Sequence, residues 1–403
     1  MVAPAYEDIG GLRTVADFVR RSVERYSDFD VRMVSLATAW QDPCHMGLTR
    51  PSSWRRGPRA EERSLDGQPY THVGAAFGEL EFARYGPNPR LRGLLADCDL
   101  IQVVAGAPAW AWPAVGLGKP VALQVATLTA VERRLRLSQD RGPLALWRRA
   151  MTSMAARADR AALTAVDAVL VENPWMLNYV TAVAGGRTVI GYGPPGVDAT
   201  RFRPATAAEL QAERPYILAV GRFADPRKNL FLLLDAYARL VGVLREPPDL
   251  MLAGATDTTG AFKARVEALG LAGRIKVLIN PDVETLAALY RRARCFALPS
   301  DEEGFGMVVI EAMASGVPVV STRCGGPDGI IDEGVNGFLV EPADPAAFCE
   351  RLLRLCRSPE LARSMGTAAR RTVEARYAEP VAARTFLDLY ERLLSKGPVS
   401  SGN

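Results

Sequence analysis

Residues 295–320 have the sequence CFALPSDEEGFGMVVIEAMASGVPVV. The apolar residues 295–298 predict a short buried strand, and the helix after the glycine loop ends at Gly316 before a second strand at 317–321. A helix that joins two short buried strands is the repeating unit of a parallel, doubly wound sheet. This stretch therefore predicts an α/β fold.

The same alternation extends outward in both directions. Before this stretch, in the second half of the chain, it predicts strands at 216–220, 250–253 and 275–278 and helices at 230–244, 262–269 and 283–293; after it, helices at 345–377 and 380–394. In the first half it predicts strands at 31–36, 100–105, 121–126, 168–171 and 188–190, with helices at 12–24, 144–163 and 175–183. Residues 50–63 have the composition of a loop. Residues 1–4 are short for a strand, which we expect to extend upstream of Met1.

The chain has 403 residues, a length that fits two or three domains. A Gly- and Pro-rich segment at 191–204 marks the boundary. We predict two Rossmann-like, doubly wound domains, residues 1–195 and 196–379, that face a central cleft. A C-terminal helix at 380–396 is expected to cross back onto the first domain, and residues 397–403 are expected to be a disordered tail.

Composition excludes several classes of protein. The 49 basic and 45 acidic residues give a net charge of +4, too small for a dedicated nucleic-acid binder but compatible with an anionic small molecule. The six cysteines form no Cys-x-x-Cys pair, so neither a usual zinc site nor any other metal site is expected. No signal-peptide pattern is present, and prolines interrupt the apolar segment 101–131, so we expect a cytoplasmic chain without a membrane span.

A first candidate site follows the strand at 216–220. Gly221 and Arg222 end that strand, and Lys228 lies six residues further on, before a helix. A turn with two cations at a helix N-terminus suits a diphosphate. Alone, the same residues also fit a solvated loop.

A more specific candidate is the segment from Glu303 to Glu311. Gly304 and Gly306 allow the backbone to approach a ligand closely, and the helix that follows begins with unpaired amides. Carboxylates frame this row of donors and suit the hydroxyl groups of a sugar or a ribose. The alternative is that Glu311 is a surface residue and Glu303 a partner of the helix dipole.

These motifs resemble the donor site of the family 4 retaining glycosyltransferases, the glycosyl transferases group 1, which have the GT-B fold. The residues that carry the resemblance are Pro299-Ser300, Glu303 to Gly306, Glu311 to Val320, Gly325-Gly326, Asn336 to Val340 and Asp344. Further matches are Gly196-Val197-Asp198 with Phe202 and Pro204, and Val220 to Arg222 with Lys228-Asn229; the match of Ile9-Gly10-Gly11 in the first domain is looser.

The resemblance implies that residues 1–195 bind the acceptor and residues 196–379 bind the nucleotide sugar, and it implies a role for each matching residue. Gly221, Arg222 and Lys228 would hold the donor diphosphate, Glu303 would contact the hydroxyls of the donor sugar, and Glu311 would bind the ribose. Gly304 and the amides of Phe305, Gly306, Met307 and Val308 would line the sugar and the phosphate, and Gly10 and Gly11 would let the N-terminal loop approach the phosphate and the acceptor.

The implied reaction is transfer of a sugar, with retention of configuration, from a nucleotide-diphosphate sugar to a small-molecule, glycan or lipid-linked acceptor. Glu303, Arg222 and Lys228 are the expected catalytic residues, and the two cations would stabilise the leaving phosphate without a metal. UDP or GDP is the expected donor nucleotide, and no further cofactor is implied. Such enzymes act in the synthesis of bacterial polysaccharides, glycolipids or glycosylated metabolites.

One feature departs from the family pattern. Many relatives carry a histidine after the central strand of the first domain, whereas residues 123–128 contain none. We place His45 and His72 in unrelated loops. Gln124, Thr127 and Thr129 are weak substitutes.

Rival functions stay open. Residues 191–196 match Gly-x-Gly-x-x-Gly, but the prolines at 194 and 195 do not open a helix as a dinucleotide site requires. A GT-B sugar phosphorylase or an epimerase shares the expected architecture. A non-catalytic nucleotide-sugar-binding partner protein would fit the missing histidine.

Residues 128–160 suggest a further partner. This segment holds eight arginines and three acidic residues, with Leu144, Leu146 and Trp147 nearby. An amphipathic surface of this kind fits peripheral contact with an anionic membrane, and a solvated helix face is the alternative.

Overall fold

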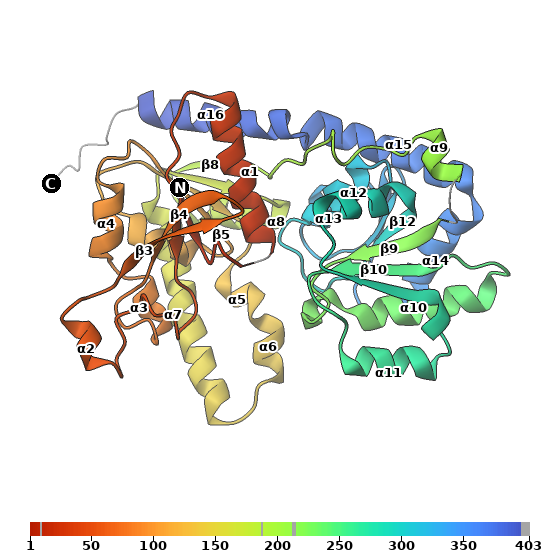
Figure 1. Cartoon of the computed structure of the whole chain (residues 1–403), viewed down its shortest axis with the longest axis horizontal. Coiled ribbons are helices and arrows are strands. Elements are labelled where there is room, and N and C mark those ends of the chain that lie inside the picture. The colour runs from red at the N-terminus through yellow and green to blue at the C-terminus, as the bar shows by residue number, and fades with distance from the viewer. Residues whose placement is uncertain (9, 187, 212–214, 396–403) are drawn as a thin grey trace. The chain divides into compact units, whose positions relative to one another are not determined.

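The computed structural model describes residues 1–8, 10–186, 188–211 and 215–395 (Figure 1). The chain divides into two compact units. The first comprises Met1–Pro195 together with the segment that begins at Ala382, and the second comprises Gly196–Val381. The predicted tail at 397–403 lies outside the described residues.

The second unit is built on a six-stranded sheet whose described strand pairs are all parallel. Its strands are β9 (Tyr216–Val220), β10 (Leu250–Gly254), β11 (Ile275–Ile279), β12 (Ala293–Leu298), β13 (Val319–Thr322) and β14 (Gly337–Val340). Their order in the sheet is β11-β10-β9-β12-β13-β14. This is the order of a Rossmann sheet, in which the chain changes direction between its first and fourth strands, here β9 and β12.

Helices cover both faces of this sheet. They are α9 (Ala207–Gln211), α10 (Leu230–Val243), α11 (Gly260–Ala268), α12 (Val283–Arg292), α13 (Met307–Ala314), α14 (Pro345–Arg357) and α15 (Pro359–Arg376), with single turns at Pro226–Lys228, Ala272–Arg274 and Pro327–Gly329. Side chains alternate along a strand, so Ile217 lies in a core with α10 and α14, and the next residue, Leu218, in a core with α13 and α15. The unit is therefore a three-layer sandwich.

The first unit contains an eight-stranded sheet. Its strands are β1 (Val2–Pro4), β2 (Val34–Leu36), β3 (Ala60–Leu65), β4 (Gln68–Val73), β5 (Ile101–Ala105), β6 (Val121–Val125), β7 (Ala168–Val171) and β8 (Val189–Tyr192). They lie in the order β3-β4-β2-β1-β5-β6-β7-β8, with only the β3–β4 pair antiparallel among the described pairs. The chain changes direction between β1 and β5.

The β3–β4 hairpin corrects one prediction. Residues 50–63 are not a loop, because they contain the short helix α2 (Pro51–Trp54) and most of β3. Asp66 and Gly67 join β3 to β4 with φ angles of 52° and 79°. Asp-Gly with two positive φ angles is a preferred two-residue hairpin turn, so this dipeptide was the missed signal.

The helices of the first unit also form two layers. They are α1 (Gly11–Tyr26), α3 (Glu81–Arg84), α4 (Pro89–Leu95), α5 (Thr129–Glu132), α6 (Arg134–Gln139), α7 (Pro143–Ala165), α8 (Pro174–Val183) and α16 (Glu379–Ser395), with a 3₁₀ helix at Pro108–Ala114. Val103 of β5 lies in a core with α8, whereas Val104 lies in a core with α1 and α16. On that face Phe386 of α16 packs edge-on against Phe18 of α1, with ring centroids 5.7 Å apart.

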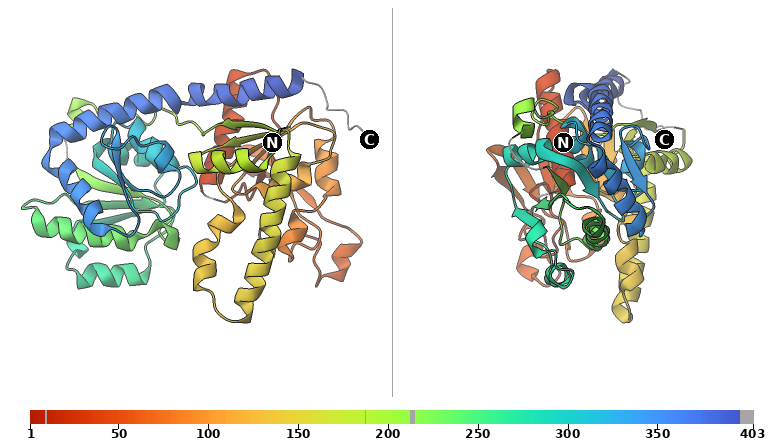
Figure 2. Two further views of the ribbon diagram at one scale, coloured as in Figure 1. Left: turned by 180° about the vertical axis from the view of Figure 1, so that it is seen from behind. Right: turned by 90° about the vertical axis from the view of Figure 1, so that its right-hand side faces the viewer.

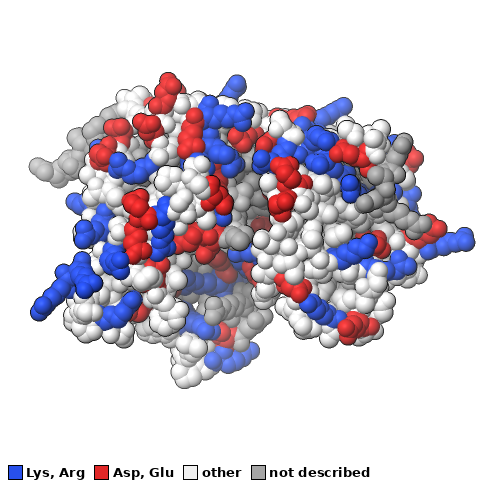
Figure 3. Space-filling view, in the orientation of Figure 1, with Lys and Arg blue, Asp and Glu red and all other residues white. Residues whose placement is uncertain are grey.

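Most predicted strands and helices are confirmed within a few residues. The predicted helix at 345–377 is two helices, because Ser358 caps α15 and Pro359 begins it. Residues 101–131 form strand, 3₁₀ helix, strand and short helix, and no helix within the described ranges is long and apolar enough to cross a membrane. Helix α7 projects beyond the sheet of its unit (Figures 1 and 2). On the face in Figure 3, basic and acidic side chains are interspersed.

Candidate functional site

The candidate site of the second unit lies where β9 and β12 end. The two strands are neighbours, and their connections leave in opposite directions, which opens a crevice between the loops at their carboxyl ends. Gly221 and Arg222 follow β9, and the loop with Glu303 follows β12. The topology therefore brings together two motifs that are about 80 residues apart in the sequence.

Asn229 fixes the loop after β9. Its φ angle is 40°, in the left-handed region that asparagine tolerates better than most residues. Its side-chain oxygen accepts a hydrogen bond from Leu232 N at the start of α10, and its side-chain nitrogen donates to Asp301 Oδ1 at 2.7 Å. Asp301 N in turn donates to Arg227 O at 2.8 Å. The loops after β9 and β12 are thus joined on either side of Lys228.

Lys228 and Glu303 form an ion pair across this junction. Lys228 Nζ lies 2.5 Å from Glu303 Oε2, and the two side chains are 16% and 18% exposed. Partial burial shields the pair from solvent, while the remaining exposure leaves both groups accessible to a ligand. The structure therefore brings together two of the three predicted catalytic residues.

Arg222 has a different setting. Its side chain is 51% exposed, and its guanidinium lies 3.9 Å from Asp225 Oδ2. Asp225 is paired more closely with Arg227, at 2.8 Å. Gly221 lies beside Lys228, since a Cβ atom at position 221 would be 3.7 Å from Lys228 Cδ. Lys228 is thus held in place by Glu303, and Arg222 extends into solvent from the same loop.

The glycine loop after β12 is held by backbone contacts. Glu303 N donates to Cys324 O, and Gly326 N donates to Glu303 O, both at 2.8 Å. A Cβ atom at Gly326 would lie 2.1 Å from Phe305 O, so only glycine allows this approach. Gly306 has a φ angle of 100° and precedes α13. Glycine is therefore required by geometry at both positions.

Helix α13 begins at Met307. The first amides of a helix have no acceptor within it, so Met307 and Val308 present donors at this end. The side chain of Phe305 is buried, with its ring centroid 5.8 Å from that of Tyr377. The ring of Phe305 packs in the core, so its side chain cannot contact a ligand. This packing fits the expectation that Phe305 contributes through its backbone amide.

Glu311 lies one turn into α13 and is not a surface residue. Burial raises the pKa of its carboxyl group to about 7, and the hydrogen bond from the Tyr290 hydroxyl, at 2.8 Å, lowers it by less. Burial disfavours the ionised form of this carboxyl group, so a ligand that donates a hydrogen bond to it would stabilise that form. Tyr290, which the sequence did not single out, orients this side chain.

Gly10 and Gly11 lie at the start of α1 in the first unit. Gly10 precedes the helix with an extended φ angle of 163°, and no atom lies within 4 Å of a Cβ built on Gly11. Packing within the chain therefore does not require glycine at position 11. Residue 9 lies outside the described residues.

The placement of His72 in a loop is wrong. His72 lies in β4 and is fully buried, because the antiparallel β3 covers the edge of the sheet. Its Nδ1 lies 3.2 Å from Glu7 Oε1, and its Nε2 lies 2.9 Å from Asp42 Oδ2. His45 does lie outside the strands and helices, as predicted.

The three weak substitutes for the missing histidine are buried side chains of the first unit. Gln124 Nε2 donates to Glu172 Oε1 and Gly193 O, at 3.0 and 2.8 Å. Thr129 contacts buried Asp159 through its amide and its hydroxyl. Thr127 is also buried. The dinucleotide alternative is not supported, because the segment after β8 leads to α9 only at Ala207.

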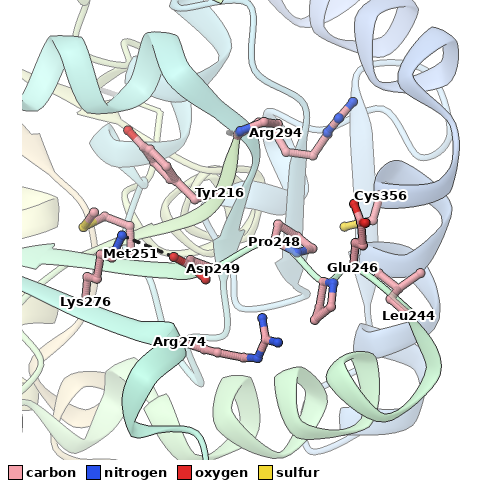
Figure 4. A pocket seen from close by; sticks show the side chains of 12 residues that line it. Tyr216, Leu244, Glu246, Pro248, Asp249, Met251, Arg274, Lys276, Arg294 and Cys356 are labelled. Carbon is pink, nitrogen blue, oxygen red and sulfur yellow. Dashed lines mark ion pairs between the residues drawn. The ribbon is translucent and has the colours of Figure 1, made fainter. Parts of the chain in front are cut away.

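A pocket of about 590 Å³ opens at the opposite edge of the six-stranded sheet (Figure 4). Tyr216 and Asp249, at the amino ends of β9 and β10, line it together with Arg274, and Lys276 pairs with Asp249 at 3.2 Å. Ligands of parallel α/β sheets bind at the carboxyl ends of the strands. This pocket is therefore separate from the candidate site.

Comparison with known proteins points to one family. Residues 204–372 match the model of the glycosyl transferases group 1. The matched region is less than half of the chain. The candidate site of the second unit lies entirely within that region.

Curated relatives of this chain carry the names of glycosyltransferases. A D-inositol 3-phosphate glycosyltransferase of Corynebacterium kroppenstedtii is 32% identical over 222 residues, which are 51% of this chain and 48% of the relative. The enzyme of the same name from Geodermatophilus obscurus is 37% identical over 182 residues, 42% of this chain and 40% of the relative. The chain thus spans half or less of the length of these relatives.

Solved structures confirm the fold of the whole chain. Sucrose-phosphate synthase from Thermosynechococcus elongatus matches with a TM-score of 0.73 and 22% identity, over 98% of this chain and 99% of that one. Anabaena HepE, solved in complex with UDP, matches with a TM-score of 0.68 and 16% identity, over 97% and 99%. The chain therefore has the predicted GT-B fold class, with two Rossmann-like units.

Proposed function

We propose that this protein is a retaining glycosyltransferase that moves a sugar from a nucleotide-diphosphate sugar to a hydroxyl group of an acceptor. The observation that carries the proposal is the Lys228–Glu303 pair at the crevice between β9 and β12, beside the first amides of α13. A cation, backbone donors and a carboxylate suit the phosphate and the hydroxyls of such a donor. Anabaena HepE has been solved with UDP and with UDP-glucose, which favours UDP as the nucleotide.

Each group has a distinct role in this proposal. Lys228 binds the diphosphate and gives up part of its contact with Glu303, whose carboxylate then accepts hydroxyls of the sugar. Arg222, which is half-exposed, closes on the diphosphate and stabilises the charge that develops as the phosphate leaves. Glu311 accepts the ribose hydroxyls in its ionised form.

The acceptor proton passes to the leaving phosphate oxygen. The bond from the anomeric carbon to that oxygen breaks as the acceptor oxygen bonds to the same face, so the configuration is retained. The two cations provide the charge stabilisation, and we propose that no metal is required. Chelation with EDTA should leave the transfer rate unchanged, and a product of inverted configuration would contradict this mechanism.

A thermal-shift screen with UDP-, GDP- and ADP-sugars tests donor binding. A ligand at 100 times its dissociation constant stabilises the protein by about 2.7 kcal/mol. Arg222→Ala, Lys228→Ala and Glu311→Ala should each reduce this shift while the variants remain folded. Lys263→Ala is the matched control, because Lys263 lies in α11 of the same unit and pairs with Asp257. Normal binding in all three site variants would refute the assignment.

Product analysis separates the alternatives. A transferase releases the nucleoside diphosphate only as fast as the acceptor is glycosylated. Dependence on free phosphate would indicate a phosphorylase, and conversion of the donor sugar without an acceptor would indicate an epimerase. Donor binding without turnover across broad acceptor panels would indicate a non-catalytic partner protein.

We also propose peripheral contact between the first unit and an anionic membrane. The start of α7 exposes Leu144, Leu146 and Trp147, by 56%, 68% and 54% of their surfaces. Arg141 and Arg149 are exposed beside them, so charge and apolar surface coincide at the end of a projecting helix (Figure 2). The positive charge is smaller than the sequence suggests, because Arg133 pairs with Glu81 and Arg148 with Asp140.

Vesicle flotation tests this contact. Replacing Leu146 and Trp147 by serine should reduce binding to phosphatidylserine vesicles about tenfold or more, since each apolar side chain is worth about 1.5–3 kcal/mol when fully buried. Trp54→Ser is the matched control, because Trp54 is 52% exposed in α2 of the same unit. Binding that does not depend on anionic lipid or on salt would contradict the proposal.

A further inference from the structure

Four polar side chains meet at the carboxyl edge of the eight-stranded sheet. Glu7 follows β1, Ser35 lies in β2, Asp42 follows β2 and His72 lies in β4. Ser35 Oγ donates to Glu7 Oε2 at 2.7 Å and accepts a hydrogen bond from Tyr6 N at 3.3 Å. His72 is fully buried, and its Nδ1 faces both Ser35 Oγ and Glu7 Oε1 at 3.2 Å.

The partners of His72 define its charge. Asp42 Oδ2 lies 2.9 Å from Nε2, and carboxylates can only accept hydrogen bonds. The hydroxyl hydrogen of Ser35 is given to Glu7, so Nδ1 must also donate. Both ring nitrogens therefore carry hydrogen, and His72 is an imidazolium held between two carboxylates. Burial alone would lower the pKa of His72, but the hydrogen bonds to Glu7 and Asp42 raise it overall.

Glu7 is the member of this network that reaches the surface. Its side chain is 30% exposed, whereas that of Asp42 is 12% exposed. It follows β1, one of the two strands between which the chain changes direction, so it lies where such sheets bind ligands. Ala5, two residues before Glu7, has a φ angle of 49°, a strained value for alanine that the loop maintains.

The chemistry of Glu7 suits the binding of a hydroxyl group. Its carboxylate has about four acceptor positions. Ser35, His72 and the more distant Arg63, at 3.7 Å, occupy part of them. Burial would raise the pKa of Glu7, but the hydrogen bonds from His72 and Ser35 bring it to about 2. So weak a base does not remove a proton from a hydroxyl group, but it accepts a hydrogen bond and orients it.

We propose that the Glu7 carboxylate binds a hydroxyl group of the sugar acceptor and that His72, held by Asp42, is the residue that positions this carboxylate. The inference deepens the proposed function and rests on it. The resemblance already implies that the first unit binds the acceptor; the new element is the residue, a carboxylate that binds a polyol.

One other property of the cluster bears on the test. Within the described ranges, Asp42, Cys44 and His72 place one ligand-type atom each within 4.8 Å of one another. Burial raises the pKa of the Cys44 thiol to about 12, which disfavours the thiolate that a metal would require. The charged and titratable groups around His72 are Glu7, Asp42, Cys44, Glu61 and Arg63.

Imidazole NMR spectra provide the test, since the chain contains only two histidines. His45 is the internal reference. Its Nδ1 accepts from Ala75 N at 2.8 Å and its Nε2 donates to Ala39 O at 3.0 Å, so it is neutral. The chain of 403 residues, saturated with UDP, is titrated with myo-inositol or glucose up to 100-fold molar excess or to the solubility limit of the polyol. The His72 signals should shift with either polyol, and those of His45 should not.

Variants locate the contact. Glu7→Gln should weaken polyol binding about tenfold, the loss expected for a hydrogen bond to a charged group. Glu62→Gln, on the opposite face of the same sheet, is the matched control and should bind normally. Asp42→Asn should lower the His72 titration midpoint and weaken polyol binding together, which a purely structural role would not couple. All variants should bind UDP as the wild type does.

Three results would overturn the inference. They are a wild-type protein whose His72 signals ignore both polyols, a Glu7→Gln variant that binds them normally, and stoichiometric Zn²⁺ that removes the His72 N–H signals. Failure of the wild type to bind UDP, GDP or ADP would instead refute the proposed function, because it concerns the second unit; the polyol titration of the first unit can still be carried out without a nucleotide.

Discussion

A partly exposed glutamate lies at the carboxyl edge of each sheet, and the two glutamates have different partners. At the edge of the six-stranded sheet, Glu303 is paired with Lys228, and both side chains are partly exposed. At the edge of the eight-stranded sheet, Glu7 is paired with His72, which is fully buried. Lys228, the partner of Glu303, is partly exposed and can move to contact a ligand. His72, the partner of Glu7, is buried and stays in place.

This difference suggests two kinds of recognition. Lys228 can exchange Glu303 for a diphosphate, because the two charges share a crevice with a helix N-terminus. His72 has both ring nitrogens occupied, so it can act only by holding Glu7 in one orientation. The second unit thus fits a charged donor, and the first unit fits a neutral, hydroxyl-bearing acceptor.

The largest expected effect comes from the glycines that bring loops together. A Cβ atom at Gly326 would lie 2.1 Å from Phe305 O, and one at Gly74 would lie 2.0 Å from Cys44 O. Each change to alanine should lower the free energy of unfolding of its own unit by about 3 kcal/mol, because backbone must move. Chemical denaturation followed in each unit measures this.

Gly93→Ala is the control for both variants. Gly93 lies inside α4, and a Cβ atom at this position would have no other atom within 4 Å, so alanine should stabilise the helix by about 0.5–1 kcal/mol. Equal stability of all three variants would show that the two loops are not held by close backbone approach.

The second effect is on the affinity for the donor, which should depend on Glu303 and not on Glu7. Glu303→Gln should weaken binding of a UDP-sugar about tenfold, because a charged acceptor of sugar hydroxyls is lost. Glu7→Gln should leave this affinity unchanged. Calorimetric titration measures both, and equal losses in the two variants would remove the distinction between a donor unit and an acceptor unit.

The third effect has opposite signs in the two units. Glu311 has a pKa raised to about 7, so its contribution to stability falls as the pH rises from 4.5 to 7. Glu7 has a pKa lowered to about 2, so its contribution is present above pH 4.5 and is lost as the pH falls towards 2. Glu311→Gln should therefore stabilise the protein at pH 8, and Glu7→Gln should destabilise it.

Each shift in stability should be on the order of 2 kcal/mol, allowing for the partial exposure of both side chains. Thermal unfolding between pH 3 and pH 8 measures them, and Glu62→Gln should change little at any pH. The same sign for both variants would contradict the assigned environments.

The smallest effect concerns the hairpin. Gly67 has a φ angle of 79° and open space around it, so Gly67→Ala should cost about 1–2 kcal/mol in the first unit alone, through backbone strain. Hydrogen exchange of the β3 and β4 amides measures the loss. Unchanged protection would show that the turn does not stabilise the pairing that buries His72.

The sequence was informative where function depends on contiguous residues. The segment from Glu303 to Glu311 lies in one loop and one helix, so its glycines, amides and carboxylates could be placed before the structure was known. The Rossmann pattern of the second unit followed from short apolar runs in the same way. The contact of Lys228 with Glu303 was not predictable, because it depends on which strands are neighbours.

The network around His72 could not be derived from the sequence. Its members come from the ends of β1 and β2 and from β4, about 30 residues apart, and none lies in a recognisable motif. Residues 50–63 are rich in charged residues, so β3 has no apolar alternation that would predict a strand. Its alternating burial arises from its pairing with β4. Asp66-Gly67 was the one local signal, and it would have placed His72 on a strand.

The most direct test of the central proposal is a calorimetric titration of UDP into the wild-type protein, Lys228→Ala and Lys263→Ala. We predict that the wild type and Lys263→Ala bind UDP equally and that Lys228→Ala binds at least about tenfold more weakly, since a charge-assisted contact to phosphate is lost. Equal affinities in all three proteins, or no binding of UDP, GDP or ADP by the wild type, would contradict a donor site at the ends of β9 and β12.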